Sequence, residues 1–274
     1  MSASIGEVPS PRQWSRVNEE NFWEFSLVLA RLGGGEVYDG GDVKWTCTAG
    51  PLFNRIFAAR FDEDKANERI GELVGEFLSR GADALWITGP STRPVDLGGR
   101  LEHCGFDHSA DWAAMDVDLA AVEGSLEEPE GCRVVEVCDE RTLADWADAM
   151  CAGFDRYADS RDATYQHFLR TGVGGELPLC HYLAYSDGLP SAACTVFLGS
   201  RTAGVYFVAT IPSARRRGLA SLVTRRGLEE CRQRGYANAV LQASRMGEPL
   251  YRKMGFRRRA GMGLYSLNVQ CRRS

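Results

Sequence analysis

The pattern of apolar and polar positions predicts helices and strands that alternate along the chain. Residues 84–88 form a short apolar run after Gly81, which indicates a buried strand that follows the end of a helix. The buried face of that helix is marked by apolar residues at helical spacing: Ile70, Leu73, Val74, Phe77 and Leu78.

A denser alternation follows in the second half of the sequence. Its mixed order predicts one central sheet flanked by helices. Strands 192–198 and 204–210 are joined by a short polar turn and predict a hairpin. The other predicted strands are 134–137, 181–185 and 239–243, and the predicted helices are 141–152, 163–170 and 218–234.

An acidic stretch separates the two halves. Residues 123–131 are EGSLEEPEG, with no apolar period, which is typical of a linker. This predicts a first domain over residues 1–122 and a second domain over residues 132–274. Residues 1–131 carry 24 Asp and Glu against 11 Lys and Arg, whereas residues 132–274 carry 13 against 21. We therefore expect an anionic ligand to bind to the second half.

Composition narrows the classes of function. The chain has 274 residues, of which 44% are hydrophobic and 25% charged, as is ordinary for a globular protein. Its nine cysteines include no Cys-x-x-Cys pair and it has four histidines, which argues against a zinc site or a disulfide scaffold. No apolar run is long enough to span a membrane, and residues 1–21 are polar. We expect a cytoplasmic protein without a metal or a membrane partner.

Two segments of the sequence resemble each other. Each contains a helix ended by Gly, then a strand, then a Gly-Phe pair, which is LEHCGF at 101–106 and YRKMGF at 251–256. This recurrence indicates an internal duplication, and chance resemblance is the alternative. The turn before the helix is acidic in the first copy and basic in the second. The alignment places FDEDKA (61–66) opposite RRRGLA (215–220), Asp64 opposite Gly218, and Leu101 opposite Tyr251.

The basic turn of the second copy has features of a phosphate site. Pro212 has no N–H to donate to a ladder and ends the preceding strand. Gly218 lets backbone N–H groups approach a ligand closely. The N-terminus of the helix that follows offers free N–H donors and a positive dipole end, which suit a pyrophosphate. A basic solvated turn is the alternative interpretation.

Residues 205–256 as a whole resemble the GNAT superfamily of acetyl-CoA-dependent N-acetyltransferases. The R/Q-x-x-G-x-G/A signature of that family matches residues 215–220, and its Y-x-x-x-G-F signature matches residues 251–256. The resemblance implies an α/β fold, with α+β mixed sheets, built from two tandem GNAT-like domains. Each domain would have a central mixed, mostly antiparallel sheet flanked by helices. The first, residues 1–122, would be a degenerate domain without a cofactor site.

The resemblance also implies roles for particular residues. The strand around Ala209 would splay from its neighbour, so that its backbone groups bond the pantetheine arm and polarise the thioester carbonyl. Backbone N–H groups of residues 216–221 would hold the pyrophosphate, and Ser244 would bond the cofactor or a water. Tyr251 would donate a proton to the departing thiolate, or else serve as a core residue. The implied cofactor-binding residues are Val208, Ala209, Thr210, Arg215, Arg216, Arg217, Gly218, Leu219, Ala220, Ser221 and Ser244.

The general base and the substrate site are less defined. The strand before the signature, GVYFVAT, has no carboxylate. His181, Asp155, Glu176 and a water held by Ser244 are open candidates for the base, with none preferred. In the family the substrate lies between the two early helices and the sheet, which implies Phe154, Tyr157 and Asp159 here. These three residues are equally consistent with an ordinary connection between helices.

The sequence therefore predicts an acetyl-CoA-dependent N-acetyltransferase that acts on a primary amine of a small molecule by direct transfer. We expect Tyr251 to be the general acid, with one acetyl-CoA per chain and no metal. The alternative is a non-catalytic acyl-CoA-binding regulatory module, which would need residues 215–220 but not Tyr251. Nucleic-acid binding is disfavoured because no such signature accompanies the arginines. We expect a monomer, since a tandem chain already holds an internal pseudo-dimer.

Overall fold

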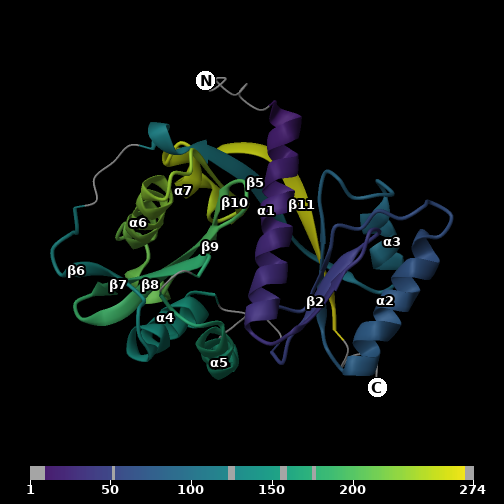
Figure 1. The fold of residues 1–274 in the computed structure, drawn as a ribbon, viewed down its shortest axis with the longest axis horizontal. Coiled ribbons are helices and arrows are strands. Elements are labelled where there is room, and N and C mark those ends of the chain that lie inside the picture. The colour runs from purple at the N-terminus through teal and green to yellow at the C-terminus, as the bar shows by residue number, and fades with distance from the viewer. Residues whose placement is uncertain (1–9, 51–52, 123–126, 155–158, 175–176, 269–274) are drawn as a thin grey trace, which may run out of the picture.

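In the part of the chain that the structure describes, eleven strands form one continuous sheet with helices on both faces (Figure 1). This computed structural model describes residues 10–50, 53–122, 127–154, 159–174 and 177–268. The strands are β1 (Glu36–Asp39), β2 (Lys44–Cys47), β3 (Arg55–Phe57), β4 (Ala84–Thr88), β5 (Asp107–Asp118), β6 (Cys132–Glu136), β7 (Leu179–Ser186), β8 (Leu189–Leu198), β9 (Ala203–Thr210), β10 (Asn238–Ser244) and β11 (Arg257–Leu267). The α-helices are α1 (Pro11–Leu32), α2 (Ala66–Arg80), α3 (Leu97–His103), α4 (Glu140–Gly153), α5 (Arg161–Thr171), α6 (Leu219–Gln233) and α7 (Glu248–Lys253).

The last strand of each half pairs with the other half. The sheet order is β1-β2-β3-β4-β11-β5-β10-β9-β8-β7-β6. Strand β5, from the first half of the sequence, pairs with β10, while β11, from the second half, pairs with β4. At the centre β5 and β11 pair antiparallel with each other. The two sheets expected from the sequence are therefore joined into one, because each half is completed by a strand of the other.

The same order of elements occurs in both halves. Three strands, a helix, a strand, a short helix and a long strand follow one another as β1, β2, β3, α2, β4, α3, β5 and again as β7, β8, β9, α6, β10, α7, β11. The parallel pairs β3–β4 and β9–β10 occupy matching places, and the other neighbouring pairs are antiparallel. The second half adds β6, α4 and α5, whereas the first half begins with the single long helix α1.

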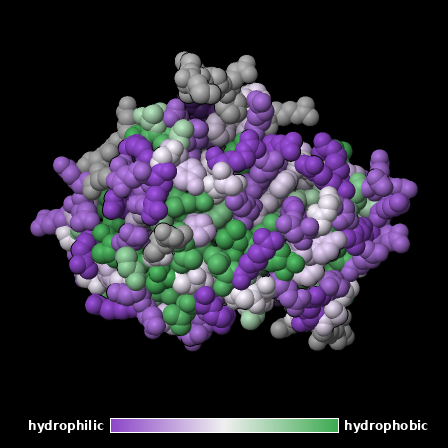
Figure 2. All heavy atoms as spheres, in the orientation of Figure 1, coloured by the Kyte–Doolittle hydropathy of each residue, from purple (hydrophilic) through white to green (hydrophobic). Residues whose placement is uncertain are grey.

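Helices cover the sheet on two sides. Side chains of α1, α4 and α5 share one buried cluster with one face of the sheet. On the opposite face α2 and α3 cover the strands of the first half, and α6 and α7 cover those of the second half. In Figure 2 hydrophobic side chains gather in the middle of the visible face, around the part where Figure 1 shows α5 beside α1.

The periodicity of the sequence located most elements correctly. The eight elements predicted in the second half agree with the structure to within three residues at each end. Gly81 ends α2 in a left-handed conformation with a φ of 62°. One alignment was wrong. Lys65 is the N-cap of α2 and Gly218 is the N-cap of α6, so Lys65, not Asp64, corresponds to Gly218. The shift arose because the acidic turn has no local signal for where its helix begins.

Because β5 and β11 are exchanged between the halves, we expect the whole chain to unfold in one cooperative transition. Ile70→Ala removes a fully buried side chain of α2, in the first half. It should cost about 2–5 kcal/mol and shift the single transition of both halves together. Thermal unfolding followed by circular dichroism and by tryptophan fluorescence measures this. Asn67→Ala, at an exposed position of the same helix, is the control. Two separate transitions, with only one shifted, would contradict the expectation.

Candidate functional site

Strands β9 and β10 part soon after they begin to pair. Their parallel ladder joins residues 203–205 to residues 239–241 only. Strand β9 then continues to Thr210 and β10 to Ser244, and in this stretch, all of which the structure describes, the two strands share no further ladder pair. We call the gap between residues 206–210 and residues 242–244 the fork. Its edges carry backbone N–H and C=O groups that a ligand could bond.

A bulge opens β9 on its other side as well. Phe207 and Val208 together stand opposite Cys194 of β8, where the register shifts. Phe207 has a φ of 50°, in the left-handed region that side chains other than Gly rarely occupy. Such bulges often redirect a strand beside a functional site. Val208, Ala209 and Thr210, which the sequence analysis assigned to the cofactor, therefore lie on the free edge of the fork.

The turn between β9 and α6 contains two left-handed residues. Arg216 has a φ of 65°, and Gly218, the N-cap of α6, has a φ of 83°. A Cβ at Gly218 would point into open space, so the conformation rather than a lack of room requires Gly there. Leu222 N donates the first helical hydrogen bond, to Gly218 O (3.1 Å). The N–H groups of residues 219–221 therefore have no partner within the helix.

The three arginines of this turn have different surroundings. Arg215 is half-buried, and its guanidinium donates to backbone carbonyls at the end of β9 (3.3 Å) and at the end of α4 (3.2 Å). Arg217 is exposed and forms an ion pair with Asp187 (3.3 Å) in the turn between β7 and β8. Arg216 is exposed. Arg215 thus holds the turn against the sheet, while Arg216 and Arg217 place positive charge on its surface.

Tyr251 lies on α7, which follows β10 closely. Its side chain is 8% exposed and packs edge-on against Phe256, with ring centroids 5.7 Å apart. It belongs to the same buried cluster as Ala243 of β10 and Leu219 of α6. Burial raises the pKa of Tyr251 well above its ordinary value, so the phenol keeps its proton at neutral pH. The core interpretation and the acid interpretation of Tyr251 are therefore compatible.

The remaining predicted residues that the structure describes have different surroundings. Ser244 is exposed at the end of β10, and its Oγ accepts a hydrogen bond from Gly247 N (3.1 Å), which shapes the turn into α7. Phe154, at the end of α4, packs against the core cluster under α4 and α5. Asp159 is exposed. Tyr157, and the base candidates Asp155 and Glu176, lie outside the described residues.

His181, on β7, is a buried neutral histidine. It is 1% exposed, and its Nδ1 lies 2.7 Å from Thr195 Oγ1. The ring centroids of Trp146 and Phe168 lie 4.9 and 5.0 Å from that of His181. Both rings also contact Phe207 at the fork. Its Nε2 is buried without a hydrogen-bond partner. Burial lowers the pKa of His181 to about 3, so the ring is uncharged at neutral pH.

The corresponding gap in the first half is closed by the chain itself. Strands β3 and β4 pair at only two positions and then part, as β9 and β10 do. Past that point Arg93 N donates to Ala59 O (3.0 Å) and Phe61 N donates to Arg93 O (3.1 Å), which forms a parallel bridge between Arg60 and Arg93. Backbone groups of this gap are thus bonded across it, whereas β9 and β10 share no ladder pair beyond Val205 and Leu241.

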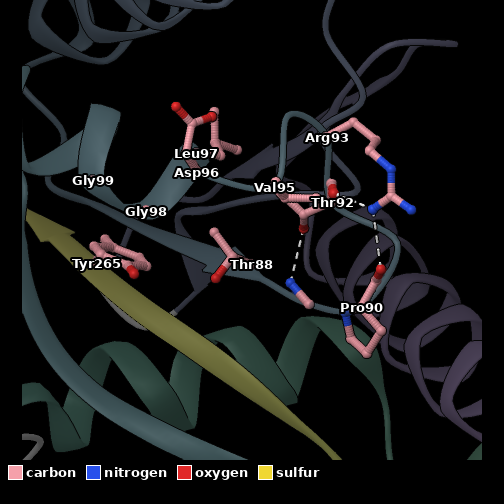
Figure 3. A pocket seen from close by; sticks show the side chains of 11 residues that line it. Thr88, Pro90, Thr92, Arg93, Val95, Asp96, Leu97, Gly98, Gly99 and Tyr265 are labelled. Carbon is pink, nitrogen blue, oxygen red and sulfur yellow. Dashed lines mark hydrogen bonds between the residues drawn. The ribbon is translucent and has the colours of Figure 1, made fainter. Parts of the chain in front are cut away.

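A pocket of about 310 Å³ lies beside this closed gap (Figure 3). It is formed by the segment from Thr88 to Gly99 and by Tyr265 of β11. In Figure 3 the guanidinium of Arg93 turns away from Tyr265 and donates to backbone carbonyls of its own loop, at Pro90 (3.2 Å) and Thr92 (2.6 Å). None of the residues that the sequence analysis assigned to a site lines this pocket, so we place the candidate site at the fork.

Helix α1 also reaches the fork, which the sequence analysis did not anticipate. Two of its residues, Asn18 and Asn21, are buried and bond to β9, β10 and neighbouring backbone. The sequence does carry a signal for the start of this helix. Ser10 and Gln13 form a capping box, in which each side chain accepts a hydrogen bond from the backbone N–H of the other.

Comparison with known proteins agrees with this geometry. Residues 200–259, from the loop before β9 to the first residues of β11, match the family model described as an acetyltransferase (GNAT) domain. This segment is therefore similar to a GNAT acetyltransferase domain. Comparison with curated protein sequences finds no match.

Solved structures share the GNAT fold over nearly the whole chain. A GCN5-related N-acetyltransferase from Kribbella flavida is 16% identical, with a TM-score of 0.69 over 92% of this chain and 94% of that one. A tandem GNAT protein from the clavulanic acid biosynthesis pathway is 10% identical, with a TM-score of 0.56 over 93% and 95%. A putative GNAT acetyltransferase from Novosphingobium aromaticivorans is 17% identical, with a TM-score of 0.56 over 94% and 98%. The predicted fold class is confirmed, and a GNAT acetyltransferase fold supports acyl transfer in general.

Within the described parts of the chain, no group of three or more His, Cys, Asp or Glu is placed to hold a metal ion. The helices described there are also too short or too polar to cross a membrane.

We expect acid to destabilise the fold through His181. The pKa of this residue is about 3 in the folded chain and about 6.5 in an unfolded chain. Between these values the unfolded state binds more protons, so stability falls as the pH is lowered, by up to about 1.4 kcal/mol per pH unit. Urea unfolding at pH 7, 5.5 and 4.5 should show a shallower pH dependence for His181→Gln than for the wild type. His103→Gln, at an exposed position of α3, should keep the wild-type dependence. An unchanged slope in His181→Gln would refute this account.

Proposed function

We propose that the chain is an acetyl-CoA-dependent N-acetyltransferase that acts on a primary amine of a small molecule. The observation that carries the proposal is the continuity of residues 206–221. In one segment they provide the free edge of β9, a turn with two left-handed residues and the unpartnered N-terminus of α6. An extended, amide-containing ligand with an anionic end matches this sequence of features, and acetyl-CoA is such a ligand.

The groups present fit acetyl-CoA along its length. The N–H groups of residues 219–221, at the positive end of the α6 dipole, would hold the pyrophosphate. Gly218 has no side chain to obstruct it, and Arg216 and Arg217 add positive charge. Backbone groups of residues 208–210 would bond the pantetheine amides. When bound, acetyl-CoA supplies an acetyl group activated as a thioester.

The residues of the chain would then promote transfer in two ways. Backbone N–H groups at the fork are fixed donors that would stabilise negative charge on the carbonyl oxygen as the amine attacks. Tyr251 would donate its proton to the leaving sulfur. Because burial raises the pKa of Tyr251, the phenol still carries its proton when the sulfur departs. Phe154 and Asp159, with Tyr157, remain our candidates for contacts with the amine.

We further propose one cofactor site per chain, in residues 132–274, with residues 1–122 as a degenerate domain. In the first half the gap between β3 and β4 is bridged at Arg60 and Arg93. The N-cap of its α2 is Lys65, whose φ of −98° differs from that of the left-handed N-cap Gly218 of α6. Three acidic residues, 62–64, precede that helix and would repel a pyrophosphate. The internal pseudo-dimer favours a monomer.

Tyr251→Phe tests the proposed acid. It removes the hydroxyl and keeps the ring that packs on Phe256. Because general acid catalysis is typically worth about 10²–10⁴-fold, we expect kcat to fall on that scale while the Kd for CoA stays near wild type. Thiol release with a panel of amines and calorimetric titration with CoA measure the two quantities.

The matched control for this prediction is Leu101→Tyr, which places a phenol at the corresponding position of the first half. Combined with Tyr251→Phe it should restore no activity. If wild type and Tyr251→Phe bind CoA equally and neither releases thiol with any amine, the chain is a binding module rather than an enzyme.

Gly218→Asp tests the cofactor site. An Asp here combines left-handed strain, about 1–2 kcal/mol, with a negative charge beside the pyrophosphate. We expect the wild type to bind one CoA per chain in calorimetry, and this variant to bind none while staying folded by circular dichroism. Gly218→Ala carries the strain without the charge and should keep measurable binding. Two CoA per chain, or normal binding by Gly218→Asp, would refute the single-site proposal.

A further inference from the structure

We propose that Asn18 and Asn21 of α1 are positioning residues that fix the separation of β9 and β10 at the fork. In this arrangement the first half of the chain sets the geometry of the site in the second half. The expected effect on kcat rests on the proposed function, whereas the effect of the two Asn side chains on the separation of β9 and β10 can be tested without it.

Asn21 ties α1 to β9. Its side chain is 3% exposed; Nδ2 donates to Thr202 O (2.8 Å), and Oδ1 accepts from Tyr206 Oη (2.7 Å). Tyr206 is the first residue of β9 beyond the last ladder pair with β10, which involves Val205. The bond therefore holds β9 at the position where it leaves its neighbour.

Asn18 ties the same helix to β10. It is 1% exposed, and its Nδ2 donates to Leu241 O (3.1 Å) and to Met115 O of β5 (2.9 Å). Its Oδ1 accepts from Gln242 Nε2 (2.8 Å). Gln242 is the first residue of β10 beyond the last ladder pair. The two Asn side chains lie three positions apart on one helix, so each holds one arm of the fork.

The side chain of Asn21 is closely packed by its neighbours. The rings of Phe25 and Tyr206 stack with centroids 3.7 Å apart. A Cβ at Gly204 would lie 2.2 Å from Asn21 Oδ1, and one at Gly199 would lie 2.6 Å from its Nδ2. A buried network whose polar groups are bonded in this way specifies one arrangement of the elements that it joins.

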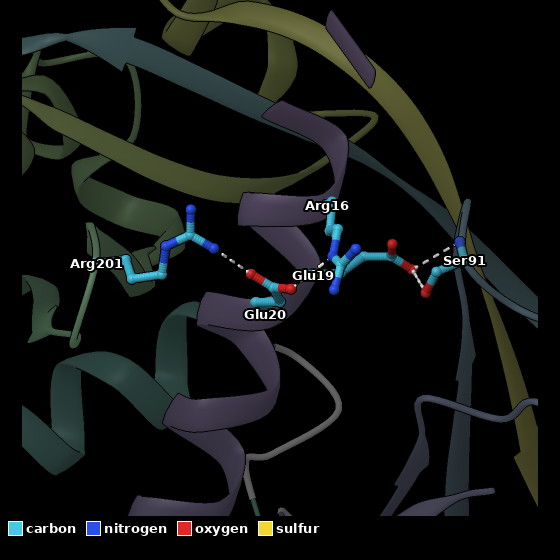
Figure 4. Close-up of polar contacts among 5 residues, drawn as sticks. All are labelled: Arg16, Glu19, Glu20, Ser91 and Arg201. Carbon is cyan, nitrogen blue, oxygen red and sulfur yellow. Dashed lines mark hydrogen bonds and ion pairs between the residues drawn. The ribbon is translucent and has the colours of Figure 1, made fainter. Parts of the chain in front are cut away.

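Helix α1 is itself held by both halves (Figure 4). Glu19 accepts from the backbone N (3.2 Å) and Oγ (3.0 Å) of Ser91, in the loop that follows β4. On its other side Glu20 pairs with Arg201 (2.8 Å), and Glu24 accepts from Ser200 N (3.0 Å), both in the loop between β8 and β9. Because α1 is bonded to loops of both halves, its position relative to the sheet is fixed.

The expected effect is on turnover more than on cofactor affinity. The anion-binding end of the site, at residues 216–221, is separate from the network, whereas the donors for the carbonyl oxygen lie along the fork. A misplacement of reacting groups by about 1 Å can cost about 10²-fold in rate. We therefore expect the loss of either Asn to lower kcat and to leave the pyrophosphate contacts in place.

The experiment compares Asn18→Ala, Asn21→Ala and Tyr206→Phe with Glu24→Ala. Glu24→Ala is the matched control, because it removes an α1 contact with the second half away from the fork. For the first three variants we expect kcat to fall about 10–100-fold, with the Kd for CoA within about threefold of wild type. We also expect faster amide hydrogen exchange at residues 206–210 and 242–244, and no acceleration there for Glu24→Ala.

A double-mutant cycle distinguishes a specific effect on the separation of β9 and β10 from a general loss of stability. Because Asn21 and Tyr206 share one bond, the double variant Asn21→Ala/Tyr206→Phe should lose no more activity than the worse single variant. Tyr206→Phe keeps the stacked ring, so it remains informative if an Asn variant does not fold. Unchanged exchange at the fork in Tyr206→Phe, or equal losses in Glu24→Ala, would overturn the proposal. If the wild type transfers no acetyl group, the proposed function fails. Amide hydrogen exchange at residues 206–210 and 242–244 then tests by itself whether Asn18 and Asn21 fix the separation of β9 and β10.

Discussion

The antiparallel pairing of β5 with β11 is the constraint on which the rest of this structure depends. Each is the last strand of one half, and each lies between two strands of the other half. Neither half can complete its sheet alone, since its strand edge would expose unpaired N–H and C=O groups. The exchange places β4 and β10 symmetrically about the centre and fixes where the two parallel gaps lie. Inter-domain motion, the default for loosely joined domains, is restricted by this shared sheet.

The two halves contain matching elements but differ at the gap between their parallel strands. In both, a parallel pair of strands separates after two or three residues. In the first half the chain returns to bond the exposed edge at Arg93, whereas in the second half β9 bulges at Phe207, on its side toward β8, and shares no further ladder pair with β10. The helix that follows has a left-handed Gly218 as its N-cap in the second half and Lys65 in the first. Local changes of a few residues are therefore sufficient to make one gap a candidate site and the other part of the scaffold.

Burial gives the candidate site a protonated donor and a rigid frame. Tyr251 packs as an aromatic core residue, and burial raises its pKa, so the phenol is protonated at neutral pH. His181 is held uncharged by the same effect, in a cluster of aromatic rings that reaches Phe207. Buried amides of α1 add the remaining contacts at the fork. A buried polar network of this kind contributes more to a unique arrangement than to net stability.

The sequence by itself located eight elements of the second half, because periodicity, Gly and Pro act over a few neighbouring residues. For the same reason it singled out the signature turn and Tyr251 as candidates. It also located the α2–β4 segment of the first half. It did not reveal the exchange of β5 and β11, since strand partners far apart in sequence leave no local pattern. Helix α1 was missed because its face toward the sheet contains Asn18 and Asn21, which are polar yet buried. Whether such residues face solvent or the backbone of a fork depends on contacts with Thr202, Leu241 and Gln242, more than 180 positions away. Only the tertiary structure decides that.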